Sequence, residues 1–113
     1  MTEFEISEGM TCDPLRYVAF SVTVIASYDI EWVAVLLYTD KEAFIAEIPM
    51  EYVGGRYSGW TILPDQYTVY DVGYYQFYAL DGLGKPAESK TYSERADSCL
   101  PPLGLDDGKR STR

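Results

Sequence analysis

The stretch from Tyr70 to Gly84 constrains the fold more than any other part of this chain, because it alternates between two faces that both carry aromatic side chains. Read at a period of two residues, one face holds Gly73, Tyr75, Phe77 and Ala79, and the other holds Tyr74, Gln76 and Tyr78. A strand that is apolar on both sides usually lies in the middle of a sheet whose faces are both covered. We therefore expect this strand to be central in a β-sandwich, followed by a hairpin turn at its glycines.

Six further segments have strand patterns, and turn signals separate them. They span residues 2–7, 16–27, 31–39, 43–50, 57–63 and 87–93. Seven short strands at this spacing, without a helical period, predict an all-β fold, a seven-stranded Greek-key β-sandwich. An up-and-down barrel is the structural alternative. The length of 113 residues fits one domain over residues 1–100, with residues 101–113 as a tail or linker.

The pattern within each strand predicts which side chains face the core. In 16–27 the even positions are apolar and the odd positions Ala19, Ser21 and Thr23 are small or polar, which indicates a solvated outer face. In 43–50 the apolar face consists of Phe44, Ala46, Ile48 and Met50, and Pro49 indicates an edge or a bulge. In 57–63 a bulge at Gly59 directs Trp60 and Ile62 inward.

The chain is strongly acidic, with a formal net charge of −9, and its basic residues form no stripe. Nucleic acid and anionic membranes are therefore not expected as partners. No apolar run approaches the roughly 18 residues needed to cross a bilayer, so membrane insertion is not expected either. The start of the chain lacks the features of a signal peptide, which leaves a cytoplasmic protein or a domain of a longer exported chain.

Two cysteines, Cys12 and Cys99, favour the exported domain. In a sandwich, the turn that holds Cys12 lies at the end where the last strand finishes, and Cys99 follows that strand. We expect the two to form a disulfide, which would stabilise the fold by on the order of 4 kcal/mol and would place the protein outside the cell or in the cell envelope. Two free thiols in a cytosolic protein are the alternative. A metal site is not expected, because the chain has no His.

Catalysis has little support in this sequence. Without His, the Ser-His and Cys-His nucleophile arrangements are absent, and no cofactor motif occurs. Carboxylate pairs such as Asp65 with Asp71 are expected by chance among so many acidic residues. A weak calcium site built from Asp29, Glu31, Glu51 and Asp81 would need several oxygens at one end of the sandwich, and ordinary turn acids explain these residues better.

One outer sheet face is predicted to be aromatic. If Val33, Val35 and Leu37 face the core, the opposite side of that sheet presents Trp32, Leu36, Tyr38, Tyr74 and Tyr78, and Phe44 and Ile48 extend it. We expect such a set, if contiguous, to exceed the ~300 to 600 Å² of the largest apolar patch on a typical monomer, and a patch of that size indicates a partner. The alternatives are that cross-strand tyrosine pairs only stabilise the sheet, or that the tail covers this face.

A family resemblance follows from the second half of the chain. Residues 54–62, Gly-Gly-Arg-Tyr-Ser-Gly-Trp-Thr-Ile, and 73–84, Gly-Tyr-Tyr-Gln-Phe-Tyr-Ala-Leu-Asp-Gly-Leu-Gly, with Ser89, resemble fibronectin type III and bacterial Ig-like modules. The likeness covers roughly residues 18–93 and implies an Ig-like, fibronectin type III-like sandwich. Such modules are mostly spacers, adhesion units or appendages of secreted enzymes, so the resemblance implies a role without catalysis.

Three functions therefore compete. The first is an interaction module that binds a protein partner or a second copy through the aromatic sheet face, including Phe44 and Gln76. The second is a carbohydrate-binding accessory module, in which Trp32, Tyr38 and the tyrosines of the central strand form a platform and Gln76 supplies a polar contact. The third is a structural spacer. An enzyme ranks last.

Overall fold

The computed structural model describes residues 2–6, 9–13 and 16–100. Within them lie eight β-strands and two short 3-10 helices. Their bounds are β1 Thr2–Glu5, β2 Thr11–Cys12, β3 Tyr17–Ala26, β4 Ile30–Tyr38, β5 Phe44–Val53, β6 Arg56–Ile62, η1 Val69–Asp71, β7 Tyr74–Asp81, β8 Pro86–Tyr92 and η2 Asp97–Cys99. The prediction of an all-β fold is confirmed, and the tail at residues 101–113 lies outside the described residues.

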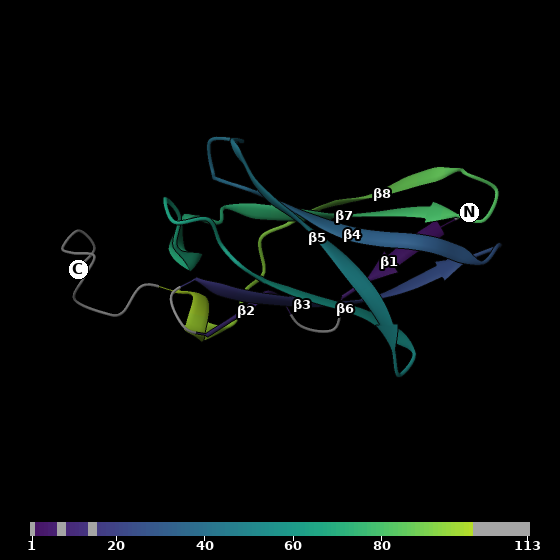
Figure 1. Ribbon diagram of the computed structural model, residues 1–113, viewed down its shortest axis with the longest axis horizontal. Helices are drawn as coiled ribbons and strands as arrows, with labels where there is room; N and C mark the ends of the chain where they lie inside the picture. Colours follow the sequence, from purple (N-terminus) through teal and green to yellow (C-terminus); the bar gives the residue numbers. More distant parts are fainter. Residues whose placement is uncertain (1, 7–8, 14–15, 101–113) are drawn as a thin grey trace.

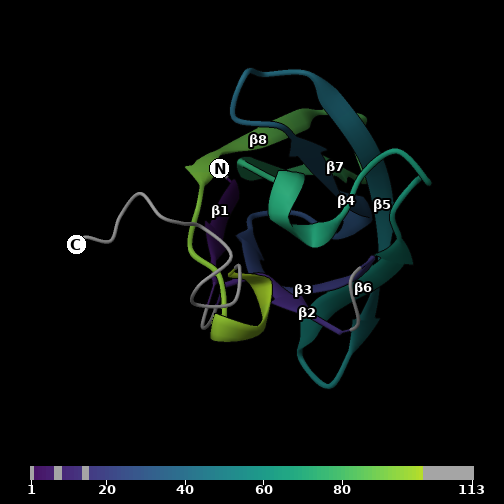
Figure 2. The same cartoon turned by 90° about the vertical axis from the view of Figure 1, so that its left-hand side faces the viewer.

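The strands form one antiparallel sheet in the order β1-β3-β6-β5-β4-β7-β8, with β2 paired to β3. Figure 1 shows two facing layers, with β4, β7 and β8 in one and β2, β3 and β6 in the other. The two layers are joined because β5 belongs to both: its first part pairs with β4 as far as Met50, and Glu51–Val53 pair with β6. Viewed from the end, the sheet is therefore nearly barrel-shaped (Figure 2).

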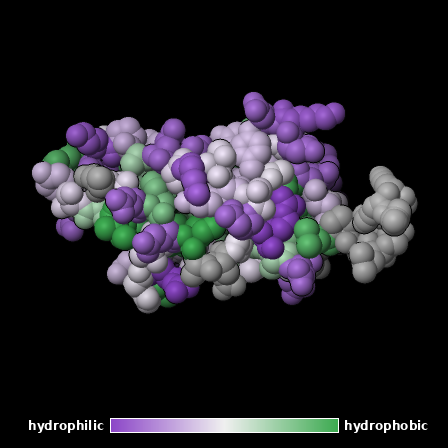
Figure 3. Space-filling model, turned by 180° about the vertical axis from the view of Figure 1, so that it is seen from behind, coloured by the Kyte–Doolittle hydropathy of each residue, from purple (hydrophilic) through white to green (hydrophobic). Residues whose placement is uncertain are grey.

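The two ends of this sheet, β1 and β8, meet on the opposite side from β5 (Figure 2). In the described part of the chain no strand ladder joins them, and one isolated parallel bridge, between Met10 and Arg95, closes the seam. The Met10 amide donates to the Glu94 carbonyl at 3.1 Å, and the Ala96 amide donates to the Met10 carbonyl at 2.7 Å. Figure 3 shows this side of the molecule, where apolar atoms form an interrupted strip between hydrophilic ones.

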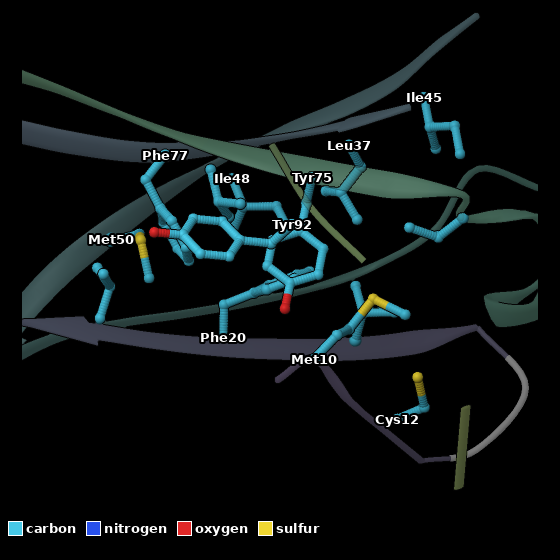
Figure 4. Close-up of a cluster of buried hydrophobic side chains, with 14 of the residues drawn as sticks. Met10, Cys12, Phe20, Leu37, Ile45, Ile48, Met50, Tyr75, Phe77 and Tyr92 are labelled. Carbon is cyan, nitrogen blue, oxygen red and sulfur yellow. The ribbon is translucent and has the colours of Figure 1, made fainter. Parts of the chain in front are cut away.

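The core lies between the layers and is dominated by aromatic rings (Figure 4). Tyr75 and Phe77 of β7 are each 1% exposed, which confirms the predicted alternation of the central strand. Phe20 of β3 meets both, with ring centroids 4.9 Å from Tyr75 and 6.5 Å from Phe77. Burial of each such side chain stabilises the fold by roughly 1.5–3 kcal/mol. The rings of facing strands thus hold the layers together.

The prediction of which side chains in residues 57–63 face the core was wrong. Trp60 and Ile62 point outward and are 60% and 55% exposed. The β3–β6 register is continuous from the Tyr17–Ile62 pair through the Phe20–Gly59 pair, so there is no bulge at Gly59. Because paired residues share a face, the inward Phe20 fixes Gly59 as inward and its neighbour Trp60 as outward.

In β5, a bulge changes the predicted alternation. The β4–β5 register shifts at the pairs Leu37–Ala46 and Tyr38–Phe44, so Ile45 is an extra residue and is buried. Phe44 consequently lies on the outer face, 55% exposed. Ile48 is only 2% exposed, so the prediction that it extends the outer aromatic face was wrong.

The two cysteines meet at the predicted end of the molecule. Cys12 lies in β2 and pairs with Val18 of β3, rather than in a turn. Its sulfur is 2.00 Å from that of Cys99 in η2, which is disulfide distance. No helix among the described residues is long and apolar enough to cross a membrane.

Candidate functional site

The register of three neighbouring strands brings the predicted partner-binding residues onto one outer surface. We name this surface the aromatic face; it consists of Trp32, Leu36, Tyr38, Phe44, Tyr74, Gln76 and Tyr78. Tyr38 of β4 pairs with Phe44 of β5 on one side and with Tyr74 of β7 on the other. Further along β4, Leu36 pairs with Gln76.

The rings of the aromatic face form two clusters. Tyr38 stacks on Tyr74 at 5.2 Å and 18°, and meets Phe44 edge-on at 5.9 Å. Trp32 and Tyr78 meet edge-on at 5.6 Å near the other end of the strands. These contacts leave Trp32 and the tyrosines half-buried, whereas Phe44 is 55% exposed. The face is therefore pre-formed, since its rings already hold one another in place.

The aromatic face combines a neutral phenol at Tyr74 with carboxylates along its border. Desolvation raises the pKa of the Tyr74 phenol above its usual value, and Glu42 and Tyr38 raise it further. The phenol therefore stays protonated and can donate a hydrogen bond. Exposed Glu47 pairs with Leu36, and exposed Glu88 pairs with Tyr78, so carboxylates border the apolar centre.

Gln76 is held by the neighbouring edge strand rather than directed freely outward. Its side-chain Nε2 donates to the Ser89 carbonyl at 2.6 Å. This contact lies at a β7–β8 register shift, where the Ser89 hydroxyl accepts from the Phe77 amide at 2.9 Å and donates to the Lys90 carbonyl at 2.6 Å. Gln76 therefore supports the edge of the aromatic face and offers little to a ligand.

A second aromatic surface, which the sequence interpretation missed, lies on the outer side of the other layer. Tyr17 of β3 and Trp60 of β6 stack at 5.4 Å and 23°, and Ile62 is exposed beside them. A hollow of about 340 Å³ adjoins Trp60, between it and Glu51 and Val53 of β5. Residues 57–63 do alternate. An unbulged strand with Gly59 facing inward would have predicted that Trp60 and Ile62 lie on this outer surface.

Two of the carboxylates considered for catalysis or metal binding, Asp71 and Asp81, have structural partners. Asp81 accepts from the backbone amides of Leu83 and Lys85, each at 2.9 Å, and so shapes the β7–β8 turn. Asp71 accepts from the Thr68 amide at 2.8 Å in a capping box of η1. Across the described ranges, no group of three or more His, Cys, Asp or Glu side chains is placed to hold a metal ion.

Comparison with protein-family models and with curated protein sequences finds no match. What the chain does must therefore be argued from its own surfaces.

Proposed function

We propose that this chain is a non-catalytic interaction module of an extracellular or cell-envelope protein, which binds a protein partner or a second copy through the aromatic face. The observation that carries the proposal is the position of Phe44. It is a large apolar ring, 55% exposed, beside a row of rings that three hydrogen-bonded strands hold in register.

The chemistry of the aromatic face suits a protein partner. Aromatic side chains provide a wide contact area and lose few rotamers on binding, and they are enriched where interfaces gain most of their energy. Leu36 supplies an aliphatic centre of the kind that protein interfaces bury. The rim carries Glu42, Glu47 and Glu88, so a basic rim on the partner would be complementary.

The fold and the cysteines support the setting of this proposal. The strand order places β3 beside β6, while β4, β5 and β6 follow one another in sequence. This order is compatible with a Greek key, and it supports the proposed assignment to the Ig-like, fibronectin type III-like sandwiches. The disulfide distance between Cys12 and Cys99 is consistent with an oxidising compartment.

The alternatives are less well supported by the geometry of this face. A carbohydrate platform would need polar groups directed at the sugar beside the rings, and the Gln76 amide is already bonded to Ser89. A spacer binds nothing through this face, so it would not require an exposed apolar ring such as Phe44. At the aromatic face, carbohydrate binding and a spacer role therefore rank behind protein binding.

The test is the molar mass of the isolated domain by light scattering, measured without reductant from micromolar to millimolar concentration. We expect a concentration-dependent dimer that Phe44→Ser weakens about tenfold or more, because the substitution removes a ring from the contact. Leu83→Ser is the matched control, since Leu83 is 68% exposed in the β7–β8 turn, away from the aromatic face.

A wild-type domain that stays monomeric at millimolar concentration rules out self-association through this face. The foreign partner is then tested by crosslinking in the native host, with Phe44→Ser and Leu83→Ser beside the wild type. If the two variants capture the same proteins as the wild type, the aromatic face is not the interface and the proposal fails.

A further inference from the structure

The hollow beside Trp60 is lined by outward-facing residues of β3 and β6. The layer that holds these strands lies opposite the layer of β4 and β7, which carries the aromatic face (Figure 1). We name this hollow the Trp60 groove; among its lining residues are Ala19, Ser21, Glu51, Val53, Ser58 and Trp60. Its volume of about 340 Å³ lies at the lower end of the roughly 300–1,000 Å³ of small-molecule sites. The groove exists because small side chains form its floor: Ser21 pairs with Ser58, and Ala19 pairs with Trp60.

One end of the groove is an aromatic wall. Tyr17 pairs with Ile62, two residues along the ladder from the Ala19–Trp60 pair and on the far side from Ser21 and Ser58. The Tyr17 ring stacks on Trp60, with ring centroids 5.4 Å apart, and Tyr17 also lines the groove. Trp60 lines the groove as well and is 60% exposed. The two stacked rings thus form an exposed aromatic wall of the groove.

The floor and the far side of the groove carry groups that form hydrogen bonds. The Ser21 hydroxyl is buried and has no hydrogen-bond partner among the described residues. Ser58 faces it from β6, and Glu51 pairs with Ser58 from β5. Hydroxyls both donate and accept, and a carboxylate accepts. A buried hydroxyl without a partner costs free energy. When the Ser21 side chain rotates about χ1 toward the groove, a ligand hydroxyl supplies the hydrogen bond that the free protein lacks.

We propose that the Trp60 groove binds a hexopyranose residue of a neutral glycan. A sugar ring has one face of C–H groups, which packs on the aromatic wall of Tyr17 and Trp60, and hydroxyls around its edge, which meet Ser21, Ser58 and Glu51. An apolar wall beside a polar floor fits this combination and fits a purely apolar ligand poorly. Acidic sugars are disfavoured, because Glu51 and the net charge of −9 repel them. This inference does not rest on protein binding by the aromatic face.

The test uses the Trp32→Phe variant, because the chain has two tryptophans and this change leaves Trp60 as the single indole reporter. The probes are soluble neutral hexasaccharides: cellohexaose, maltohexaose, mannohexaose and N-acetylchitohexaose. We expect at least one probe to shift Trp60 fluorescence and the Trp60 indole N–H resonance. In calorimetry on the otherwise unchanged chain, Trp60→Ala should weaken that binding about tenfold or more, and Ser21→Ala about fivefold.

Phe44→Ser should bind the same probe as tightly as the wild type, since Phe44 lies on the other layer. Thermal unfolding of Trp60→Ala checks the fold, which should be retained because Trp60 is 60% exposed. Hexagalacturonate should not bind. The inference is overturned if no neutral probe perturbs Trp60 at millimolar concentration, if Trp60→Ala binds as well as the wild type, or if the acidic probe binds as tightly as the neutral ones.

Discussion

Tyr75 is a buried residue with a polar tip, and its hydroxyl has one well-placed partner. The side chain is 1% exposed, and its hydroxyl donates to the Glu94 carbonyl at 2.7 Å. Burial raises the pKa of Tyr75 to about 12, from the ordinary value of 10.0. The folded protein therefore holds this proton at a pH where the unfolded chain has released it.

This difference in pKa predicts a specific loss of stability in alkali. Below pH 10 the phenol is protonated in both states and its contribution is fully present; as pH rises from 10 to about 12, only the unfolded chain ionises, and the free energy of unfolding falls. Tyr75→Phe lacks this contribution, so its stability in urea should fall less steeply across that window. Tyr28→Phe, at an exposed position, should fall as steeply as the wild type. Equal slopes for wild type and Tyr75→Phe would contradict the expected ionisation.

At the scale of the strands, alternation predicted the buried face of β7 but not that of β5. Tyr75 and Phe77 face the core as expected, because the alternation of β7 is preserved across its ladder with β4 at these positions. Phe44 and Ile48 were placed on one face, whereas the bulge at Ile45 separates them. A bulge depends on how two distant strands meet, so one strand's pattern does not contain it.

The two candidate sites also differ in whether the pattern of single strands predicts them. The aromatic face was largely foreseeable, because β4 and β7 are each apolar on both sides and must present rings outward. The Trp60 groove was not, since it depends on which residue of β6 lies opposite Phe20. Gly59 was taken as the site of a bulge, although its role is to let β5 pass close to β6.

Gly59 marks the point where β5 crosses from one layer to the other. A Cβ at this position would lie 2.9 Å from the Pro49 carbonyl oxygen and 3.2 Å from Cγ2 of Ile48. We therefore expect Gly59→Ala to push the two strands apart and to lower the free energy of unfolding by about 1–3 kcal/mol in urea denaturation. Gly82→Ala is the matched control: its nearest neighbour, the Asp29 carbonyl oxygen, is 3.5 Å away, and stability should change by no more than about 0.5 kcal/mol. A Gly59→Ala protein as stable as the control variant would show that the strands separate there without cost.

For the whole molecule, the question is what keeps a nearly closed sheet from opening at its seam. On the β5 side the layers are continuous through backbone pairing, whereas on the other side β1 and β8 meet without a ladder among the described residues. The Met10–Arg95 bridge and the Cys12–Cys99 pair both lie at one end of that seam. Arg95 adds a link to the start of β7, because its guanidinium donates to the Gly73 carbonyl at 3.2 Å. Closure of the seam is therefore concentrated at this end.

The disulfide should then stabilise the whole fold and, above all, the closed end of the seam. The bond closes a loop between residues 87 positions apart, and removal of such a crosslink costs about 2–5 kcal/mol. We expect the Cys12→Ala/Cys99→Ala double variant to lose that amount in urea denaturation, and the wild type in reductant to match it. Hydrogen exchange should quicken first at the Ala96 and Met10 amides, while the amides of β4 should exchange only on global unfolding. If the variant loses stability evenly, with β4 amides exchanging as fast as the Met10 amide, the seam does not open separately and the sheet unfolds as one unit.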